Sequence, residues 1–311
     1  MSRYPFMDYA EKYMDTMRGQ YSVSSWDTIM RRYRRMEREL IDLKEQKKIS
    51  TLSPKNMTAE DVRQYLIYRK GLERSSSDMR HEISAIRNLF AHLENTAAEL
   101  CMIRNPGLYP KGKPPRQPSM TDRVYRKILA RSEEIGSEDW ELTRAYALVL
   151  LSIKGGNRNK EIRLADVYDI DTRNWVFDII HVKAEDTYGG PRQVPIHPDV
   201  RPILAKYLLL RKKWLNERSA NFDALFPSLS SADGYLSANS LRRIKAKVEN
   251  DIGEKFDLRM CRRTFGQQYI NAGVDIESVS VLMGHATTKT TEDYYCRKSM
   301  VDASENAKGV W

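Results

Sequence analysis

The chain has 311 residues, enough for two domains that each bury a core. Basic residues exceed acidic ones by 10, and residues 1–116 hold much of the excess, with 22 basic and 15 acidic side chains. Such charge favours a polyanionic partner, although basic proteins of other kinds share it. Three irregularly spaced cysteines argue against a disulfide framework or a zinc site. With no signal-type N-terminus and no apolar stretch of membrane length, we expect a cytoplasmic protein off the membrane.

The N-terminal third predicts a small bundle of helices. Between residues 26 and 47, apolar side chains recur in alternating steps of three and four, which places them on one helix face opposite an arginine-rich face. Two more helical patterns begin at Thr58 and Asp78, and a short helix fits residues 6–18. We therefore expect residues 1–104 to form an α-helical domain.

Five prolines in residues 105–119 prevent continued helix and predict a stiff, basic linker. Residues 120–311 then form a second, mixed domain that ends in a C-terminal tail. We expect helices at 121–135, 138–154, 199–218, 237–250, 258–272 and 275–283, and strands at 166–170, 175–182 and 192–196. Short, turn-rich connections between the strands favour antiparallel pairing. The predicted fold class is mainly α with a small antiparallel β-sheet (α+β).

A set of polar side chains in this second domain suggests phosphodiester chemistry. Arginine offers paired donors to phosphate oxygens, and a tyrosine hydroxyl can form a covalent ester with phosphorus. Each residue alone is weak support, because most Arg–Glu pairs lie on the surface and few tyrosines are nucleophiles. Their joint occurrence in order favours DNA strand breakage and rejoining. In chain order the candidates are Arg158, Glu161, Lys183, Arg259, Arg262, His285 and Tyr294.

The order and spacing of these residues resemble the tyrosine recombinase family, also called the phage integrase family. Residues 156–161 resemble the family's G-x-R-x-x-E turn, and Lys183 follows a strand, like the family's hairpin lysine. Residues 259–262 resemble its H-x-x-R helix. Residues 282–285 resemble its L-G-H motif, and Tyr294 follows nine positions later. The N-terminal bundle is similar to the family's core-binding domain.

The chain also departs from the family pattern at several positions. Arg259 and Arg263 stand where the family usually has histidine, and Asn157 and Met283 replace commoner residues. Arginine at 259 can donate to a phosphate oxygen but cannot act as a base near neutral pH.

The resemblance implies a role for each candidate. Tyr294 is the expected nucleophile, with Tyr295 as its rival, and forms a 3′-phosphotyrosyl bond. Lys183 is the expected general acid. The remaining expected roles are neutralising phosphate charge (Arg158, Arg259 and Arg262), orienting the arginine (Glu161) and hydrogen bonding to a phosphate oxygen (His285).

As a whole, the resemblance implies a site-specific DNA recombinase or integrase. Its partner is double-stranded DNA, it assembles as a tetramer on two sites, and it needs no cofactor and no metal ion. Two alternatives remain: a type IB topoisomerase that relaxes DNA with similar chemistry, and a DNA-binding relative without catalysis.

Overall fold

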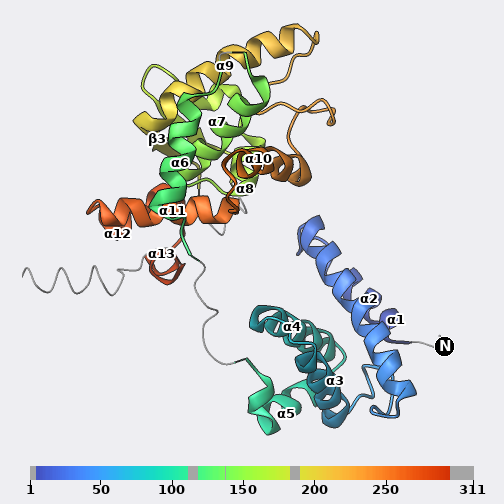
Figure 1. Cartoon of the computed structure of the whole chain (residues 1–311). Helices are drawn as coiled ribbons and strands as arrows, with labels where there is room; N and C mark the ends of the chain where they lie inside the picture. The colour runs from blue at the N-terminus through green and yellow to red at the C-terminus, as the bar shows by residue number, and fades with distance from the viewer. Residues whose placement is uncertain (1–4, 111–117, 137, 183–189, 295–311) are drawn as a thin grey trace, which may run out of the picture. The chain divides into compact units, whose positions relative to one another are not determined.

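The computed structural model describes residues 5–110, 118–136, 138–182 and 190–294, the last two of these (293 and 294) through their backbone. The chain divides into two compact units, residues 1–115 (unit 1) and 116–311 (unit 2) (Figure 1). Each unit has its own hydrophobic core. In the described part of the chain, no helix is both long and apolar enough to cross a membrane.

Unit 1 is a bundle of helices, as the apolar spacing predicts. Its elements are α1 (Pro5–Thr16), α2 (Val23–Glu45), α3 (Ala59–Gly71), α4 (Ser76–His92), α5 (Ala97–Arg104) and the 3₁₀ turn η1 (Pro106–Leu108). Thr58 caps α3, and a reciprocal bond joins its backbone N–H to Asp61, so the expected start is confirmed. Helix α4 begins earlier than expected because Ser75 caps it, and Asp78 lies in its first turn. The sequence pattern missed α5.

A buried ionic network joins α2, α3 and α4 of unit 1. The fully buried Arg69 donates to Glu39 at 2.8 Å and to Asp78 at 2.9 Å. The equally buried Glu82 accepts from Arg32 at 3.1 Å and from Arg35. The arginines of α2 therefore divide into two groups, because Arg32 and Arg35 turn inward while others face solvent.

Unit 2 is built around α7, which is buried on nearly every side. Its helices are α6 (Asp122–Glu133), α7 (Trp140–Gly155), α8 (Asn159–Leu164), α9 (Arg201–Asn216), α10 (Ala238–Ile252), α11 (Leu258–Asn271), α12 (Ile276–Met283) and α13 (Thr288–Tyr294). Helices α6, α9, α10 and α11 all pack against α7, which lies among them in Figure 1. A helix that is apolar all round must be enclosed in this way. The position of α7 matters because the first candidate arginine follows its C-terminus.

A small antiparallel sheet completes unit 2. Its strands β1 (Ile170–Asp171), β2 (Val176–Ile179) and β3 (Arg192–Pro195) lie in sequence order, with Phe177 opposite both Ile170 and Val194. The predicted fold class is thus confirmed. The strand expected at 166–170 is wrong over most of its length, because residues 167–169 form a 3₁₀ turn, η2 (Val167–Asp169). The Asp169 carboxylate accepts from the backbone N–H of Asp166 at 2.8 Å and stabilises this turn.

Candidate active site

The turn between α7 and α8 places the first arginine of the site. Gly156 ends α7 with φ +61°, and a Cβ there would lie 2.7 Å from Cδ1 of Phe265, so only glycine fits. Arg158 then caps α8. Its Nη1 donates to Glu161 Oε1 and its Nη2 to the carbonyl oxygen of Gly284, both at 2.7 Å. This side chain is 23% exposed, so its guanidinium is held but reachable from solvent.

The carboxylate of Glu161 lies at the centre of the site, with its side chain fully buried. It accepts from the backbone N–H of Arg158 at 2.7 Å and from Nη1 and Nη2 of Arg192 at 3.2 and 2.8 Å. Arg262 Nη1 lies 3.9 Å away. Burial alone would raise the pKa of Glu161, but the hydrogen bonds and charge of Arg192, the backbone N–H of Arg158 and the charge of Arg262 lower it to about 2. Glu161 is therefore ionised at neutral pH.

Arg262 reaches the same place from α11 and is 4% exposed. Its Nη1 donates to the carbonyl oxygen of Gly156, and its Nη2 donates to that of Met283, both at 2.5 Å. The same Nη2 lies 2.8 Å from Nε2 of His285. Arg262 thus joins the end of α7 to the turn after α12.

His285 has a defined hydrogen-bonding state. Arginine has only donors, so Nε2 of His285 must accept from Arg262, and in a neutral ring Nδ1 must then carry the proton. Nδ1 lies 2.7 Å from the hydroxyl of the fully buried Thr291 and donates to it. Burial, followed by the charges of Arg262, Arg158 and Arg192, lowers the pKa of His285 to about 3. The ring is neutral at physiological pH.

The turn after α12 depends on its glycine. Gly284 has φ +62°, and a Cβ there would lie 2.8 Å from Nη1 of Arg192. Met283, one of the departures from the family pattern, is fully buried in the core of unit 2, so an apolar side chain meets the requirement of this position. Helix α13 follows the turn and ends at Tyr294.

The structure therefore brings four of the seven sequence candidates together: Arg158, Glu161, Arg262 and His285. Arg259 lies on the exposed side of α11 and makes no hydrogen bond or ion pair with any described residue. Lys183 lies outside the described residues, and so does the rival nucleophile Tyr295. Tyr294 is placed through its backbone in α13. The roles expected for these residues remain predictions.

Two further residues, Arg192 and Thr291, bind to these four side chains but were not among the candidates. A signal for Arg192 exists in the sequence: side chains alternate along a strand, so it shares a face with Val194, which is buried. A charged residue on a core face needs a charged partner. Thr291 lies three positions before Tyr294 in α13 and has no comparable signal, because Thr288 and Thr290 stand beside it and nothing in the sequence singles out one threonine as buried.

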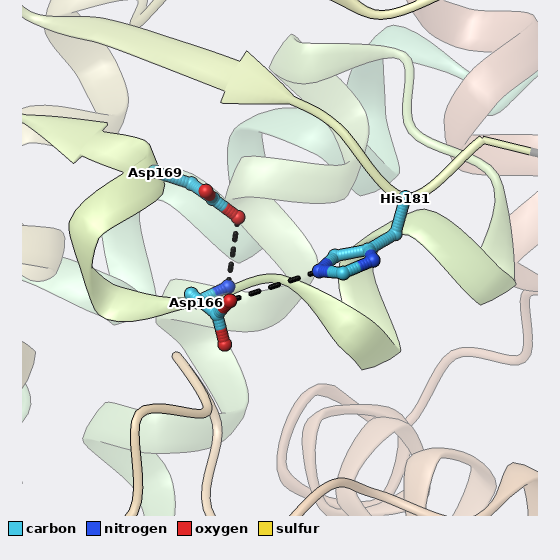
Figure 2. A group of neighbouring side chains, drawn as sticks. All are labelled: Asp166, Asp169 and His181. Atoms are coloured by element: carbon cyan, nitrogen blue, oxygen red, sulfur yellow. Dashed lines mark hydrogen bonds and ion pairs between the residues drawn. The ribbon is translucent and has the colours of Figure 1, made fainter.

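A separate polar group lies where β2 leaves the sheet (Figure 2). Asp166, Asp169 and His181 have ligand atoms within 4.8 Å of one another, so these side chains could hold a metal ion, a juxtaposition the sequence did not predict. Hydrogen bonds account for much of the arrangement. Tyr235 donates to Asp166 at 2.6 Å, Asp169 accepts from the Asp166 backbone, and His181 Nε2 lies 3.7 Å from Asp166.

Comparison with known proteins agrees with the motifs. Residues 118–300 match the phage integrase family. The tyrosine recombinase XerC of Thermodesulfovibrio yellowstonii is 22% identical over 81% of this chain and 82% of its own length. The tyrosine recombinase XerD of Rickettsia bellii is 25% identical over 83% and 85%.

Solved structures share the fold. The Tn1549 transposon integrase, in complex with transposon right end DNA, superposes with a TM-score of 0.66 at 15% identity, covering 96% of this chain and 98% of that one. Because the family match spans more than half of the chain, the protein belongs to the phage integrase family. It is an enzyme of the tyrosine recombinase class, a site-specific recombinase.

Proposed function

We propose that the chain breaks and rejoins DNA strands at the cluster of Arg158, Glu161, Arg262 and His285, with Tyr294 as nucleophile. One observation carries this proposal. The guanidinium groups of Arg158, at the N-cap of α8, and of Arg262, in α11, lie 2.7 and 3.9 Å from the buried carboxylate of Glu161. Both also donate to carbonyls of the 283–284 turn, and α13 runs from this turn to Tyr294.

The charge of the cluster suits a phosphate. Three arginines, Arg158, Arg192 and Arg262, surround the single carboxylate of Glu161, which leaves an excess of two positive charges in a largely buried place. The donors of Arg158 and Arg262 that are now bonded to backbone carbonyls can turn to phosphate oxygens and stabilise the charge that develops there during cleavage. Arginines can thereby supply the positive charge that metal ions supply in many phosphoryl-transfer enzymes.

In the proposed reaction, the Tyr294 hydroxyl loses its proton to solvent water, and its oxygen attacks the scissile phosphorus as the bond to the 5′-oxygen breaks. The products are a 3′-phosphotyrosyl ester and a free 5′-hydroxyl, whose proton comes from Lys183. A 5′-hydroxyl from a partner strand then attacks the ester and releases the tyrosine. The bond energy is kept in the ester, so no cofactor enters the balance.

Both ring nitrogens of His285 are already hydrogen bonded, which restricts its role in this reaction. Its ring donates from Nδ1 to Thr291 and accepts at Nε2 from Arg262, so neither nitrogen is available to a phosphate in the arrangement described. When Arg262 turns to the phosphate, Nε2 is released. The expected hydrogen bond from His285 to a phosphate oxygen therefore requires that the ring be protonated or change tautomer at that step.

We further propose that the protein acts inside the cell on double-stranded DNA. Unit 1 is the proposed core-binding domain. Arg31, Arg34 and Arg38 are exposed on α2 at spacings of three and four, whereas Arg32 and Arg35 are used in the buried ionic network. Replacing one exposed arginine by glutamine should reduce the slope of log affinity against log salt by about 0.9 if it contacts one phosphate. An unchanged slope in all three variants would contradict this placement.

We also propose assembly as a tetramer on two DNA sites, with the C-terminal tail joining protomers. The experiment uses full-length protein and a deletion of residues 299–311, each with two labelled duplexes. Strand exchange by the full-length chain and its loss in the deletion, with single-site binding kept, supports the proposal. Relaxation of supercoiled DNA by a monomer that never joins two duplexes would favour the topoisomerase alternative.

The chemistry itself is tested on a nicked suicide duplex that carries a sequence selected by the protein from a randomised duplex library. The nick lets the short 5′-hydroxyl product diffuse away, so the covalent complex accumulates. Arg158→Ala and Arg262→Ala should each abolish accumulation while leaving DNA binding measurable. A covalent complex in either variant at the rate of the unsubstituted protein would refute the proposed site.

A further inference from the structure

Arg192 is a buried arginine that belongs to none of the sequence motifs, and its positive charge is its only part in the proposed reaction. It is the first residue of β3, 9% exposed, and lies on the face of the strand that also buries Val194. A charged side chain is rarely buried unless it is paired and hydrogen bonded. Its partners therefore indicate what it does.

The guanidinium of Arg192 binds two other segments at once. Nη1 and Nη2 form a fork on Glu161, and Nε donates to the carbonyl oxygen of Leu282 at 2.7 Å. One side chain thus ties the return strand of the β2–β3 hairpin to the first turn of α8 and to the end of α12. Gly284 leaves the space that the guanidinium occupies.

The partner of Arg192 is also the partner of Arg158. Glu161 accepts from the Arg158 backbone and side chain with the same carboxylate that Arg192 grips. Burial raises the pKa of Glu161, and the hydrogen bonds and charge of Arg192 are the largest influences that lower it. Without Arg192, the carboxyl group would protonate more easily and lose part of its hold on Arg158.

We propose that Arg192 is a positioning residue for strand cleavage, which fixes Arg158 through Glu161 and fixes the 282–285 turn relative to the hairpin. The inference rests on the proposed function. Arg192 itself contacts no reacting atom. It acts by holding in place Arg158 and the 282–285 turn, which do contact the phosphate in the proposed reaction.

The test compares Arg192→Met and Arg192→Lys with a matched control, Arg211→Met. Arg211 is also buried in unit 2, but its donors go to the backbone carbonyls of Phe222 and Ala224, away from the cluster. Cleavage is measured in single turnover with saturating suicide duplex at pH 5 to 8, and stability by urea unfolding. A misplacement of about 1 Å costs on the order of 10² in rate, which is the loss we expect for Arg192→Met.

A second readout separates positioning from loss of stability. Arg192→Met should lose activity more steeply than the unsubstituted chain as pH falls from 7 to 5, because Glu161 becomes protonated. Arg192→Lys keeps the charge without the fork, so it should restore the pH profile and only part of the rate. Arg211→Met should keep both the rate and the profile.

Several results would overturn the inference. Cleavage by Arg192→Met at the unsubstituted rate would do so, as would equal losses in Arg192→Met and Arg211→Met with parallel pH profiles. If Arg192→Met does not fold, Arg192→Lys decides the question, and a full rate in that variant would count against a need for the fork. If the unsubstituted protein forms no covalent complex with the duplex, the proposed function fails instead.

Discussion

Replacing Glu161 by glutamine should destabilise unit 2 by an amount that the structure allows to be calculated. A pKa of about 2 in the folded protein, against an ordinary value of 4.5, corresponds to about 3 kcal/mol of stabilisation at neutral pH. Removing one partner of a buried ion pair typically costs about 3–5 kcal/mol, which agrees. Glutamine keeps the shape but cannot neutralise the arginines around it.

The pH dependence of this loss has a definite sign. The folded-state pKa of Glu161 is lower than the unfolded one, so its stabilisation is complete above about pH 4.5 and is lost as pH falls towards 2. The difference in unfolding free energy between the unsubstituted protein and Glu161→Gln should therefore be constant from pH 7 to 5. It should shrink clearly at pH 4 and pH 3.

The assay is urea unfolding followed by tryptophan fluorescence, to which Trp140, Trp175 and Trp214 of unit 2 contribute. Glu249→Gln is the matched control, because Glu249 is also buried in unit 2 and pairs with Lys245 at 2.6 Å, outside the cluster. Both variants should lose stability, but only Glu161→Gln should also lose cleavage. A loss below about 0.5 kcal/mol at pH 7, or one that does not change with pH, would refute the reasoning.

Three further predictions concern the chemistry. Lys183→Ala should slow cleavage by a factor on the order of 10²–10⁴, and a sulfur in place of the bridging 5′-oxygen should restore much of the rate; no rescue would mean that Lys183 is not the general acid. Thr291→Val should leave Nδ1–H of His285 without its acceptor, destabilise unit 2 by about 1–3 kcal/mol and slow cleavage. Thr291→Ser retains the hydroxyl and should keep both the stability and the cleavage rate, as measured by unfolding curves and single-turnover kinetics. Cleavage should continue in excess chelator because arginines supply the positive charge, and a strict requirement for a divalent ion would instead direct attention to the group around Asp166.

The helices of unit 2 were largely predictable because apolar spacing reports directly on which face is buried. The structure of residues 166–170 was not predictable in this way. Their residue pattern suggests a strand, but a hydrogen bond to the Asp169 side chain stabilises a 3₁₀ turn there instead. In unit 1, α5 was missed because it is only eight residues long and its buried residues, Ala97, Ala98 and Cys101, are small. Local side-chain bonds and small residues carry little signal in an apolar pattern.

In the site, the sequence predicted residues that lie in motifs of fixed spacing. Arg158 and Glu161 are three positions apart, and His285 follows its glycine directly, so local order is enough to find them. Arg192 is 31 positions from Glu161 and meets it only because β3 pairs in a register that turns this side chain inward. Thr291 likewise becomes a partner of the histidine only when α13 folds back on the turn.

The central claim is that Tyr294 forms the covalent bond to DNA, and the most direct measurement is tandem mass spectrometry of the trapped protein–DNA complex. After digestion of the DNA and the protein, we expect a nucleotide remnant linked through its 3′-phosphate to Tyr294, and no covalent complex in Tyr294→Phe at unchanged DNA affinity. A remnant on Tyr295, or a complex that persists in Tyr294→Phe, would contradict it.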